Sequence, residues 1–336
     1  MPSNVIKHAL LPLALLAAAL PTPWAADGPV KSKPAEKGVP ILWSDPADIA
    51  SRNLYYGPGG KEHEPHPPFT FVKEDLEGTN PKFVVKDRDG VKWKVKLGLE
   101  ARSETAATRL VWAAGFFATE DYYLRDLPVS GMPAKLHRGW KFVDPDGTVH
   151  NVRLKREPEG RKKIGIWSWD DSPFTGTREC NGLRTLMAVI NNWDLKDVNN
   201  AIYRRGPEEI YMVSDLGASF GTPGRSWPRE RAKDNLDEFS RAKFVRRLTR
   251  DSVDFQAPAR PQWEYAVNPK EYFSRFRLEH IGKNIPRADA KWLGDIMSRL
   301  SIEQIRDAFR ASGYSPDEVE GFSKLIEDRI VVLTDM

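Results

Sequence analysis

Residues 69–115 read FTFVKEDLEGTNPKFVVKDRDGVKWKVKLGLEARSETAATRLVWAAG, and the prediction of the fold starts from this stretch. Apolar and polar residues alternate in Phe69–Lys73, Lys82–Lys86 and Val91–Leu97, which predicts three short strands. The DRDG sequence between the second and third strands is typical of a hairpin turn, so these two strands are expected to pair.

A helix is predicted next, over Ser103–Ala114. Ser103 suits an N-cap, apolar side chains recur at helical spacing, and Gly115 ends the pattern. A further strand is expected over Tyr122–Leu127. Residues 69–130 are therefore predicted to form a small antiparallel sheet with one helix.

The remainder, residues 131–336, is predicted to be mostly helical. Apolar residues at helical spacing begin at Gly182, a polar loop follows at Asn191–Asn200, and Ile210–Val213 reads as a short strand. From about Asp234 the pattern indicates helices again. The expected fold class is α+β, with two lobes and a helical tail on the second.

The N-terminus has the order of an export signal. Lys7 and His8 precede the apolar run Ala9–Leu20, and the small residues Ala25 and Ala26 follow. The protein is therefore predicted to be exported, to the periplasm or the medium, with a signal peptide that ends at Ala26. A retained membrane anchor is the alternative, which the short apolar run disfavours.

Residues 27–68 are rich in Pro, Gly and charge, and they are predicted to be an extended lead-in with little regular structure. His63 and His66 lie here among glutamates, which leaves a metal site and a solvated loop as interpretations. The prolines favour the loop, because they prevent the helix that would bring the ligands together.

Composition narrows the possible partners. Cys180 is the only cysteine, so a disulfide within the chain is impossible. The formal net charge of +4 is small for 336 residues and does not indicate nucleic-acid binding. Acids are interleaved with the basic residues of Arg225–Arg250 at helical spacing, which favours a solvated helix face over a polyanion site. No stretch after the N-terminal run predicts a membrane span.

The same opening stretch contains residues that suit phosphate binding. Gly78 lies in the loop between two predicted strands, where the absence of a side chain lets backbone amides approach a phosphate. Lys96, on the third strand, is placed to pair with nucleotide phosphates. Glu104, in the following helix, is placed to hold that lysine as an ion pair. The alternatives are a solvated strand face for Lys96 and a favourable helix-dipole position for Glu104.

Two acidic loops follow later in the chain. Asp194 stands five residues before Asn199, and Asp215 follows a predicted strand. Asn199 and Asp215 offer the hard oxygen ligands that Mg²⁺ prefers, and Asp194 suits a base near an acceptor hydroxyl. Ordinary loop capping and turn formation are the alternatives for these residues. The predicted cofactors are ATP and Mg²⁺ or Mn²⁺.

Five segments together resemble the protein-kinase-like superfamily, and most closely its HipA-like and phosphoinositide-kinase-like branch. They are GTNPK (Gly78–Lys82), VKLG (Val95–Gly98), ETAATRLVWAAG (Glu104–Gly115), NNWDLKDVNN (Asn191–Asn200) and VSDLG (Val213–Gly217). The resemblance implies a two-lobed kinase-like fold, with residues 69–130 as the N-lobe and 131–336 as the C-lobe. The site residues that it implies are Gly78, Lys82, Lys96 and Glu104 for the nucleotide, Asn199 and Asp215 for the metal, and Asp194 with Lys96 for catalysis.

One departure from that branch bears on activity. Arg-His usually follows the catalytic aspartate there, whereas Leu195 and Lys196 follow Asp194 here. Three hypotheses stay open. The first is an exported phosphotransferase acting on a protein, glycan or small-molecule hydroxyl. The second is a kinase fold that binds a ligand or partner without catalysis. The third is an unrelated binding protein of the cell envelope.

Overall fold

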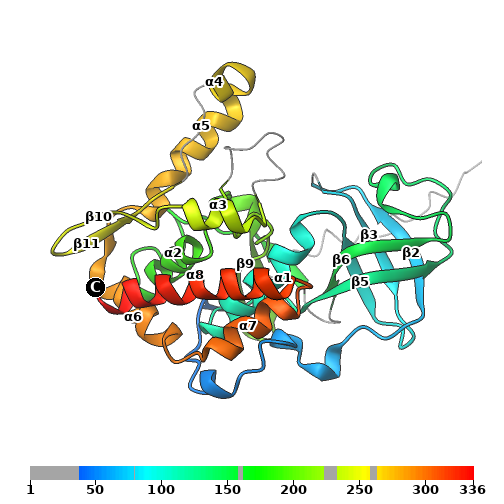
Figure 1. Cartoon of the computed structure of the whole chain (residues 1–336), viewed down its shortest axis with the longest axis horizontal. Coiled ribbons are helices and arrows are strands. Elements are labelled where there is room, and N and C mark those ends of the chain that lie inside the picture. Colours follow the sequence, from blue (N-terminus) through cyan, green and yellow to red (C-terminus); the bar gives the residue numbers. More distant parts are fainter. Residues whose placement is uncertain (1–37, 79, 158–161, 223–232, 258–262) are drawn as a thin grey trace, which may run out of the picture. The chain divides into compact units, whose positions relative to one another are not determined.

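The computed structural model describes residues 38–78, 80–157, 162–222, 233–257 and 263–336. These ranges form a mixed α+β protein, as predicted, in which a strand-rich part adjoins a mostly helical part (Figure 1). The predicted signal peptide lies outside the described residues. None of the described helices combines the length and the apolar character that crossing a membrane requires.

The strand-rich part is a closed barrel, not the small antiparallel sheet that the sequence predicts. The strand order is β2-β3-β4-β6-β5, and β5 closes the ring by pairing parallel with β2. β6 lies beyond the predicted lobe boundary at residue 130, yet it completes the barrel between β4 and β5. The strands are β2 (Phe69–Asp75), β3 (Lys82–Lys86), β4 (Lys92–Lys96), β5 (Asp121–Ser130) and β6 (Thr148–Arg156).

The alternating pattern of β3 and β4 separates the barrel interior from its outer face. Phe83, Trp93 and Val95 are buried in the interior, where they form a hydrophobic core of the barrel's own. Lys94 and Lys96 alternate with these residues and therefore lie on the outer face. Part of this outer face lies against helix α1 and the four-stranded sheet described below.

Helix α1 (Glu100–Ala113) begins three residues earlier than predicted, so Ser103 lies inside the helix and is not its N-cap. Gly98 takes a left-handed conformation (φ 93°), which turns the chain from β4 directly into the helix. Ser103 Oγ instead donates a hydrogen bond to the Gly217 carbonyl oxygen at 2.8 Å. Most of α1 is buried, and its apolar residues belong to the main hydrophobic core.

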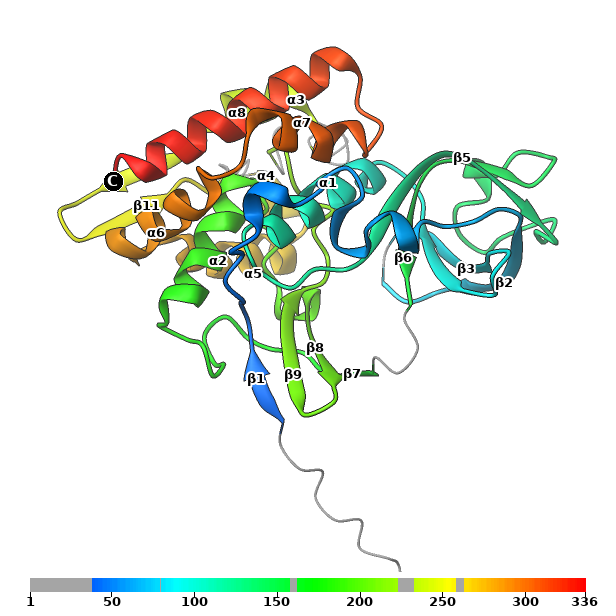
Figure 2. The same ribbon diagram turned by 90° about the horizontal axis from the view of Figure 1, so that it is seen from below.

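A four-stranded sheet of order β1-β9-β8-β7 lies beside the barrel (Figure 2). Its first strand comes from the predicted lead-in and pairs parallel with β9, and Leu42, Ile49 and Leu54 from that segment enter the main core. Residues 38–68 have little regular structure beyond β1 and short 3₁₀ helices, and part of this segment packs into the main core. The strands are β1 (Val39–Ile41), β7 (Lys162–Gly165), β8 (Asn200–Arg205) and β9 (Glu208–Val213).

The helical part is built around α2, whose Thr177 N-cap accepts a hydrogen bond from the Cys180 amide. The helices are α2 (Arg178–Val189), α3 (Leu236–Arg241), α4 (Trp263–Val267), α5 (Pro269–Leu278), α6 (Arg287–Met297), α7 (Ile302–Arg310) and α8 (Pro316–Thr334). The predicted helical tail also contains a small sheet of β10 (Val245–Leu248), β11 (Ser252–Phe255) and β12 (Ile285–Pro286). The basic stretch is therefore not one helix face, because its described part passes from α3 into β10.

Candidate active site

Lys96 is the centre of a buried ion-pair cluster between β4, α1 and the loop after β9. Its Nζ lies 2.8 Å from Glu104 Oε2, 3.2 Å from Asp215 Oδ1 and 2.7 Å from Glu100 Oε2. The Lys96 residue is only 3% exposed. The predicted Lys96–Glu104 ion pair is confirmed, and the solvated-strand interpretation of Lys96 is wrong.

Arg153 on β6 shares Glu104 with Lys96. Its Nη2 donates to Glu104 Oε2 at 2.9 Å, and its Nη1 lies 3.7 Å from Asp121 Oδ1. The register of β4 against β6 places Arg153 directly beside Lys96. Lys96 and Arg153 carry like charges on adjacent strands and repel each other. The Glu104 carboxylate contacts both and offsets this repulsion.

The charges of the cluster shift the protonation equilibria of its members. Burial alone would lower the pKa of Lys96, but Glu104, Asp215 and Glu100 outweigh it and raise that pKa. Burial alone would raise the pKa of Asp215, but the charge of Lys96 and the Gly217 amide lower it below the ordinary value. Lys96 is therefore a fixed cation and Asp215 a fixed anion at neutral pH.

Asn199 joins the two acidic loops. Its backbone oxygen accepts hydrogen bonds from the amides of Ser214 and Asp215, at 2.8 and 3.3 Å. Its side-chain Nδ2 donates to the Asp194 carbonyl oxygen at 2.6 Å. Asp194, Asn199 and Asp215 thus form one connected unit where β8 begins and β9 ends, and Asp215 links that unit to Lys96.

Two oxygen atoms of this unit are of the chemical type that a divalent cation prefers. Asp215 Oδ1 is engaged by Lys96 and by the Gly217 amide, whereas Oδ2 has no hydrogen-bond partner among the described residues. The Asp215 side chain is 44% exposed, so a ligand can reach it from solvent. Asn199 uses its amide nitrogen internally, and no described residue binds its Oδ1. A carboxylate and an amide oxygen supply only part of a Mg²⁺ shell, which suits an ion that is shared with phosphates.

The loop that carries Gly78 reaches the cluster through Asn80. Gly78 has a positive φ of 65°, and Arg138 binds its carbonyl oxygen. Asn80 Nδ2 donates to Glu100 Oε2, one of the carboxylates around Lys96. Lys82 lies opposite Lys96 in the β3–β4 register, and its Nζ is 3.9 Å from Asp75 Oδ2. The structure thus brings Gly78 and Lys82 to the edge of the cluster, without direct contact with Asp215.

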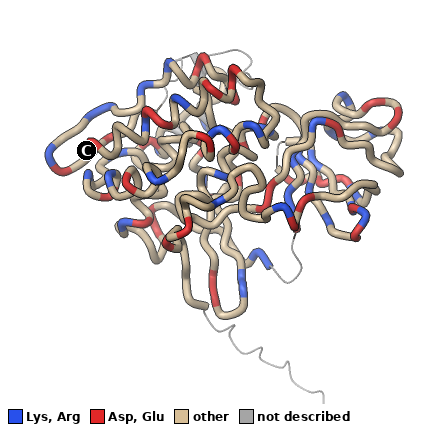
Figure 3. Tube along the Cα trace, turned by 60° about the horizontal axis from the view of Figure 1, so that its bottom comes forward, with Lys and Arg blue, Asp and Glu red and all other residues tan. Residues whose placement is uncertain are grey.

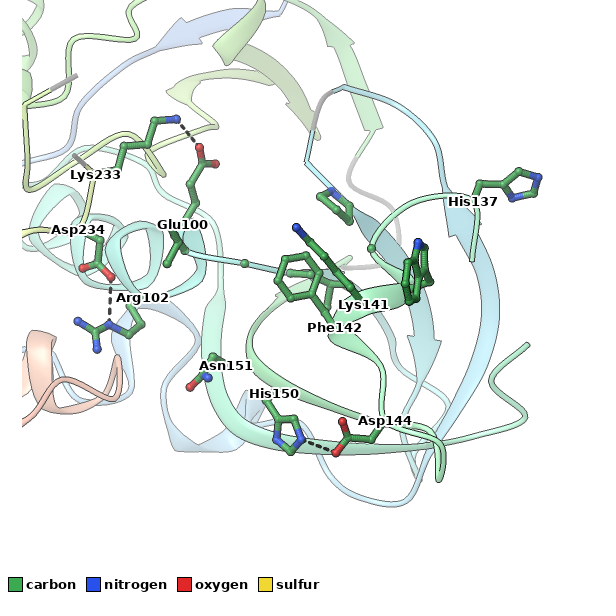
Figure 4. Close-up of a pocket in the computed structure, with 16 residues that line it drawn as sticks. Glu100, Arg102, His137, Lys141, Phe142, Asp144, His150, Asn151, Lys233 and Asp234 are labelled. Carbon is green, nitrogen blue, oxygen red and sulfur yellow. Dashed lines mark hydrogen bonds and ion pairs between the residues drawn. The ribbon is translucent and has the colours of Figure 1, made fainter. Parts of the chain in front are cut away.

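A cavity of about 770 Å³ opens beside Glu100 (Figure 4). Lys233 pairs with Glu100 at its wall, and Arg102 pairs with Asp234 at 3.0 Å. Trp140, which is largely exposed, adds an aromatic surface to the cavity lining. The cavity has room for a ligand of nucleotide size, and it borders the ion-pair cluster through Glu100 and Lys233, whereas Lys96 and Asp215 do not line it.

The sequence interpretation missed several members of this site. Glu100 stands four residues after Lys96, at a helix start that the prediction placed too late. Arg153 and Asp121 reach the cluster only through strand pairing, which local alternation does not reveal. The cationic side chains of the cluster are fewer than its carboxylates, and the resulting negative charge favours a bound cation. The cations are Lys96, Arg153 and Lys233, and the carboxylates are Glu100, Glu104, Asp121 and Asp215.

The two histidines of the lead-in do not form a metal site. His63 Nδ1 lies 2.9 Å from Glu120, and His66 pairs separately with Asp89. Within the described ranges, no three or more His, Cys, Asp or Glu side chains gather in a way that would hold a metal ion. The two histidines are thus held by separate carboxylates.

The chain was compared with known proteins. No protein-family model and no curated protein sequence matches it. Among solved structures it is similar to the proinflammatory kinase CtkA of Helicobacter pylori, with a TM-score of 0.45, 10% identity and coverage of 79% of this chain and 96% of that one. It is also similar to the Golgi casein kinase, with a TM-score of 0.32 and 13% identity over 85% of this chain and 78% of that one. A structure of that kinase with Mn/ADP bound matches at the same TM-score and identity. These are distant matches to kinase-like folds, and none singles out the HipA-like branch.

Proposed function

We propose that this protein is a metal-dependent nucleotide phosphotransferase with a two-lobed kinase-like organisation. The observation that carries the proposal is the contact of the fixed cation Lys96 with both Glu104 and Asp215. Phosphoryl transfer needs a cation on the nucleotide phosphates and carboxylates on the metal, held in fixed relation. ATP is the proposed nucleotide, and Mg²⁺ or Mn²⁺ the proposed metal.

In this proposal each side chain has a distinct task. Lys96, fixed by Glu104 and Glu100, presents its ammonium group to the phosphates, while Asp215 Oδ2 and Asn199 Oδ1 are the metal ligands. Asp194 orients the acceptor hydroxyl and takes its proton. The bound metal ion would offset the phosphate charge. The loop at Gly78 and Lys82 contributes further phosphate contacts from the β2–β3 side.

Three points of the proposal rest on the sequence alone. The signal-like N-terminus supports export, and with it an acceptor hydroxyl on a protein, glycan or small molecule outside the cytoplasm. The segment resemblance supports the HipA-like branch. The proposed lobes are residues 69–130 and 131–336, although β6 pairs within the barrel.

A second candidate function is ligand binding without transfer, and one contact favours it. Lys196 Nζ lies 3.5 Å from Asp194 Oδ1, so the proposed base already faces a cation. The presence of Leu195 and Lys196 in place of Arg-His also favours ligand binding without transfer.

Measurements of ATP affinity and of ATP turnover distinguish the phosphotransferase from the binding protein. Asp215→Asn is expected to abolish Mg²⁺-dependent ATP binding, because it removes a charged metal ligand while it keeps the side-chain shape. Asp194→Asn is expected to leave ATP affinity within about twofold and to lower the transfer rate by roughly 100-fold or more. Calorimetric titration measures the affinity, and release of ADP measures turnover.

The control is Asp170→Asn, because the Asp170 side chain is exposed and, among the described residues, pairs with His280. It is expected to change neither quantity. Wild-type protein that fails to bind ATP with Mg²⁺ or Mn²⁺ would rule out the phosphotransferase. Tight binding with no turnover in the wild type and in Asp194→Asn alike would establish the binding protein.

A further inference from the structure

A second pocket lies where the barrel meets the four-stranded sheet, and it is lined by cationic side chains. This junction pocket has a volume of about 340 Å³. Lys94 reaches it from β4, Lys155 and Arg156 from β6, and Lys163 from β7. Figure 3 shows Lys and Arg gathered on the barrel strands at this boundary.

Carboxylates neutralise only half of this charge. Glu120 lies 3.3 Å from Arg156, and Lys94 lies 3.0 Å from Asp75 and 3.6 Å from Glu157, so two of the four cations have ion-pair partners. Lys155 and Lys163 have no hydrogen-bond or ion-pair partner anywhere in the described part of the chain. The junction pocket therefore presents two ammonium groups without a counter-charge.

The strand register concentrates this charge at a cost in stability. Lys94 lies directly opposite Lys155 across β4 and β6. Two residues further along β4, Lys96 lies opposite Arg153. Like charges in such positions repel, and a protein has no structural need to place them there. Burial and the charge of Arg153 lower the pKa of Lys155 to about 8, against the opposite influence of Asp121 and Glu104.

We propose that the junction pocket binds a small ligand through a phosphate group. A phosphate monoester carries close to two negative charges at neutral pH, which matches the two ammonium groups that lack partners. The side chain of Tyr203 also lines the pocket, and a phenol hydroxyl suits a phosphate oxygen. The pocket volume lies near the lower end of the range for small-molecule sites, so the ligand is small.

This inference goes beyond the proposed phosphoryl transfer and does not depend on it. None of the proposed metal ligands lines the junction pocket, so binding there requires no divalent cation. The two proposals can therefore fail separately.

The test is a titration of the full chain with inorganic phosphate in EDTA, at ionic strength held constant with NaCl, followed by phosphorus NMR. Lys155→Met and Lys163→Ser are each expected to weaken binding about tenfold or more, because each removes a charged hydrogen-bond donor. Lys162→Ser is the matched control, since Lys162 is an exposed lysine of β7 like Lys163 but does not line the pocket. It is expected to leave the affinity within about twofold, as is Asp215→Asn.

Proton uptake on phosphate binding provides a second test, which uses the wild-type protein. At pH 8 a bound anion should complete the protonation of Lys155, so calorimetry in buffers of different ionisation enthalpy should show net proton uptake on phosphate binding. Absence of phosphate binding would overturn the proposal. An equal loss in Lys162→Ser would also overturn it, as would a loss that appears only in Lys96→Met, which would place the phosphate at the ion-pair cluster.

Discussion

Lys96 and Lys155 lie on the same outer face of the barrel in opposite electrostatic surroundings. Carboxylates contact Lys96 from two elements and raise its pKa, so its charge is stabilised where it lies. Burial, together with the charges of Arg153 and Lys94, lowers the pKa of Lys155. The fold therefore stabilises the charged form of Lys96 and destabilises the charged form of Lys155.

Replacement of Lys155 by methionine is expected to stabilise the protein. The folded pKa of about 8 lies below the ordinary value of 10.5, so the folded state holds this proton more weakly than the unfolded state. The penalty is fully present below about pH 8 and disappears as pH rises toward 10.5. The Met variant should therefore exceed the wild type by up to about 3 kcal/mol at pH 7 and by little at pH 10.5.

Urea unfolding of both proteins at the two pH values measures this difference. Lys162→Met, on the exposed strand β7, serves as the control and should show no gain at either pH. A Met variant that is less stable than the wild type at pH 7 would mean that the methylene contacts or hydrogen bonds of Lys155 outweigh its charge penalty.

At the scale of elements, α8 holds the end of α2 through one arginine. Arg329 Nη1 donates to the carbonyl oxygens of Ala188 and Val189 at 3.1 and 2.9 Å, and its guanidinium stacks on Phe239. These carbonyls belong to the last turn of α2, where the helix itself offers no donors. Because the Asp194 loop follows directly, Arg329 also fixes the start of the proposed catalytic loop.

Arg329→Met is expected to lower the free energy of unfolding by about 1–3 kcal/mol, because the loss of its hydrogen bonds to two buried carbonyls outweighs the burial penalty that lowers the pKa of Arg329 to about 9. It leaves buried carbonyls without their charged donor while it keeps much of the side-chain volume. Lys324→Met is the matched control on α8, because Lys324 pairs only with exposed carboxylates and its loss should cost at most about 0.5 kcal/mol. Equal effects of the two changes in denaturant titrations would contradict this role of Arg329.

The elements that were predicted correctly depend on local sequence signals, whereas most of those that were missed depend on contacts between distant parts of the chain. β3 was predicted to the residue, because alternation and the DRDG turn are local signals. β1 was missed because its three residues are stabilised by β9, far along the chain. The β10–β11 hairpin was missed because interleaved charges resemble a helix face. Ser103 was misplaced because the sequence did not reveal the left-handed turn at Gly98.

The same distinction applies to the site. Lys96 and Glu104 were predicted to pair because a strand followed by a helix brings them together locally, and that pair is confirmed. Hydrogen bonds join Asp194, Asn199 and Asp215 in one segment, whereas the convergence of their side chains on a metal ion stays a prediction. Arg153 could not be predicted, because its place beside Lys96 depends on the closure of the barrel.

At the scale of the whole molecule, the barrel and the helical part have separate hydrophobic cores. The contact of Lys96 with Asp215 joins a barrel strand to the loop after β9. A ligand bound at this contact therefore touches both parts at once. Its binding energy is expected to reduce local opening in both.

Hydrogen exchange with and without Mg²⁺ and ATP tests this coupling. Amides of β4 and of residues 213–217 are expected to exchange more slowly together when the ligand is present, by about tenfold or more at saturation. In Asp215→Asn both effects should vanish. Slowing that is confined to one of the two segments would show that the ligand does not bridge them.

Strand β1 pairs with a strand that lies far along the chain, and this separation affects the order in which the sheet can form. The amide of Gly38 donates to Glu209 Oε1, and these residues are 171 positions apart in the chain. A chain that is made or transported from its N-terminus must therefore hold this segment unpaired until β9 has followed it. Closing so long a loop costs entropy that only the finished sheet repays. Docking of β1 is thus a late step, and until it happens β9 has an open edge that another chain can occupy.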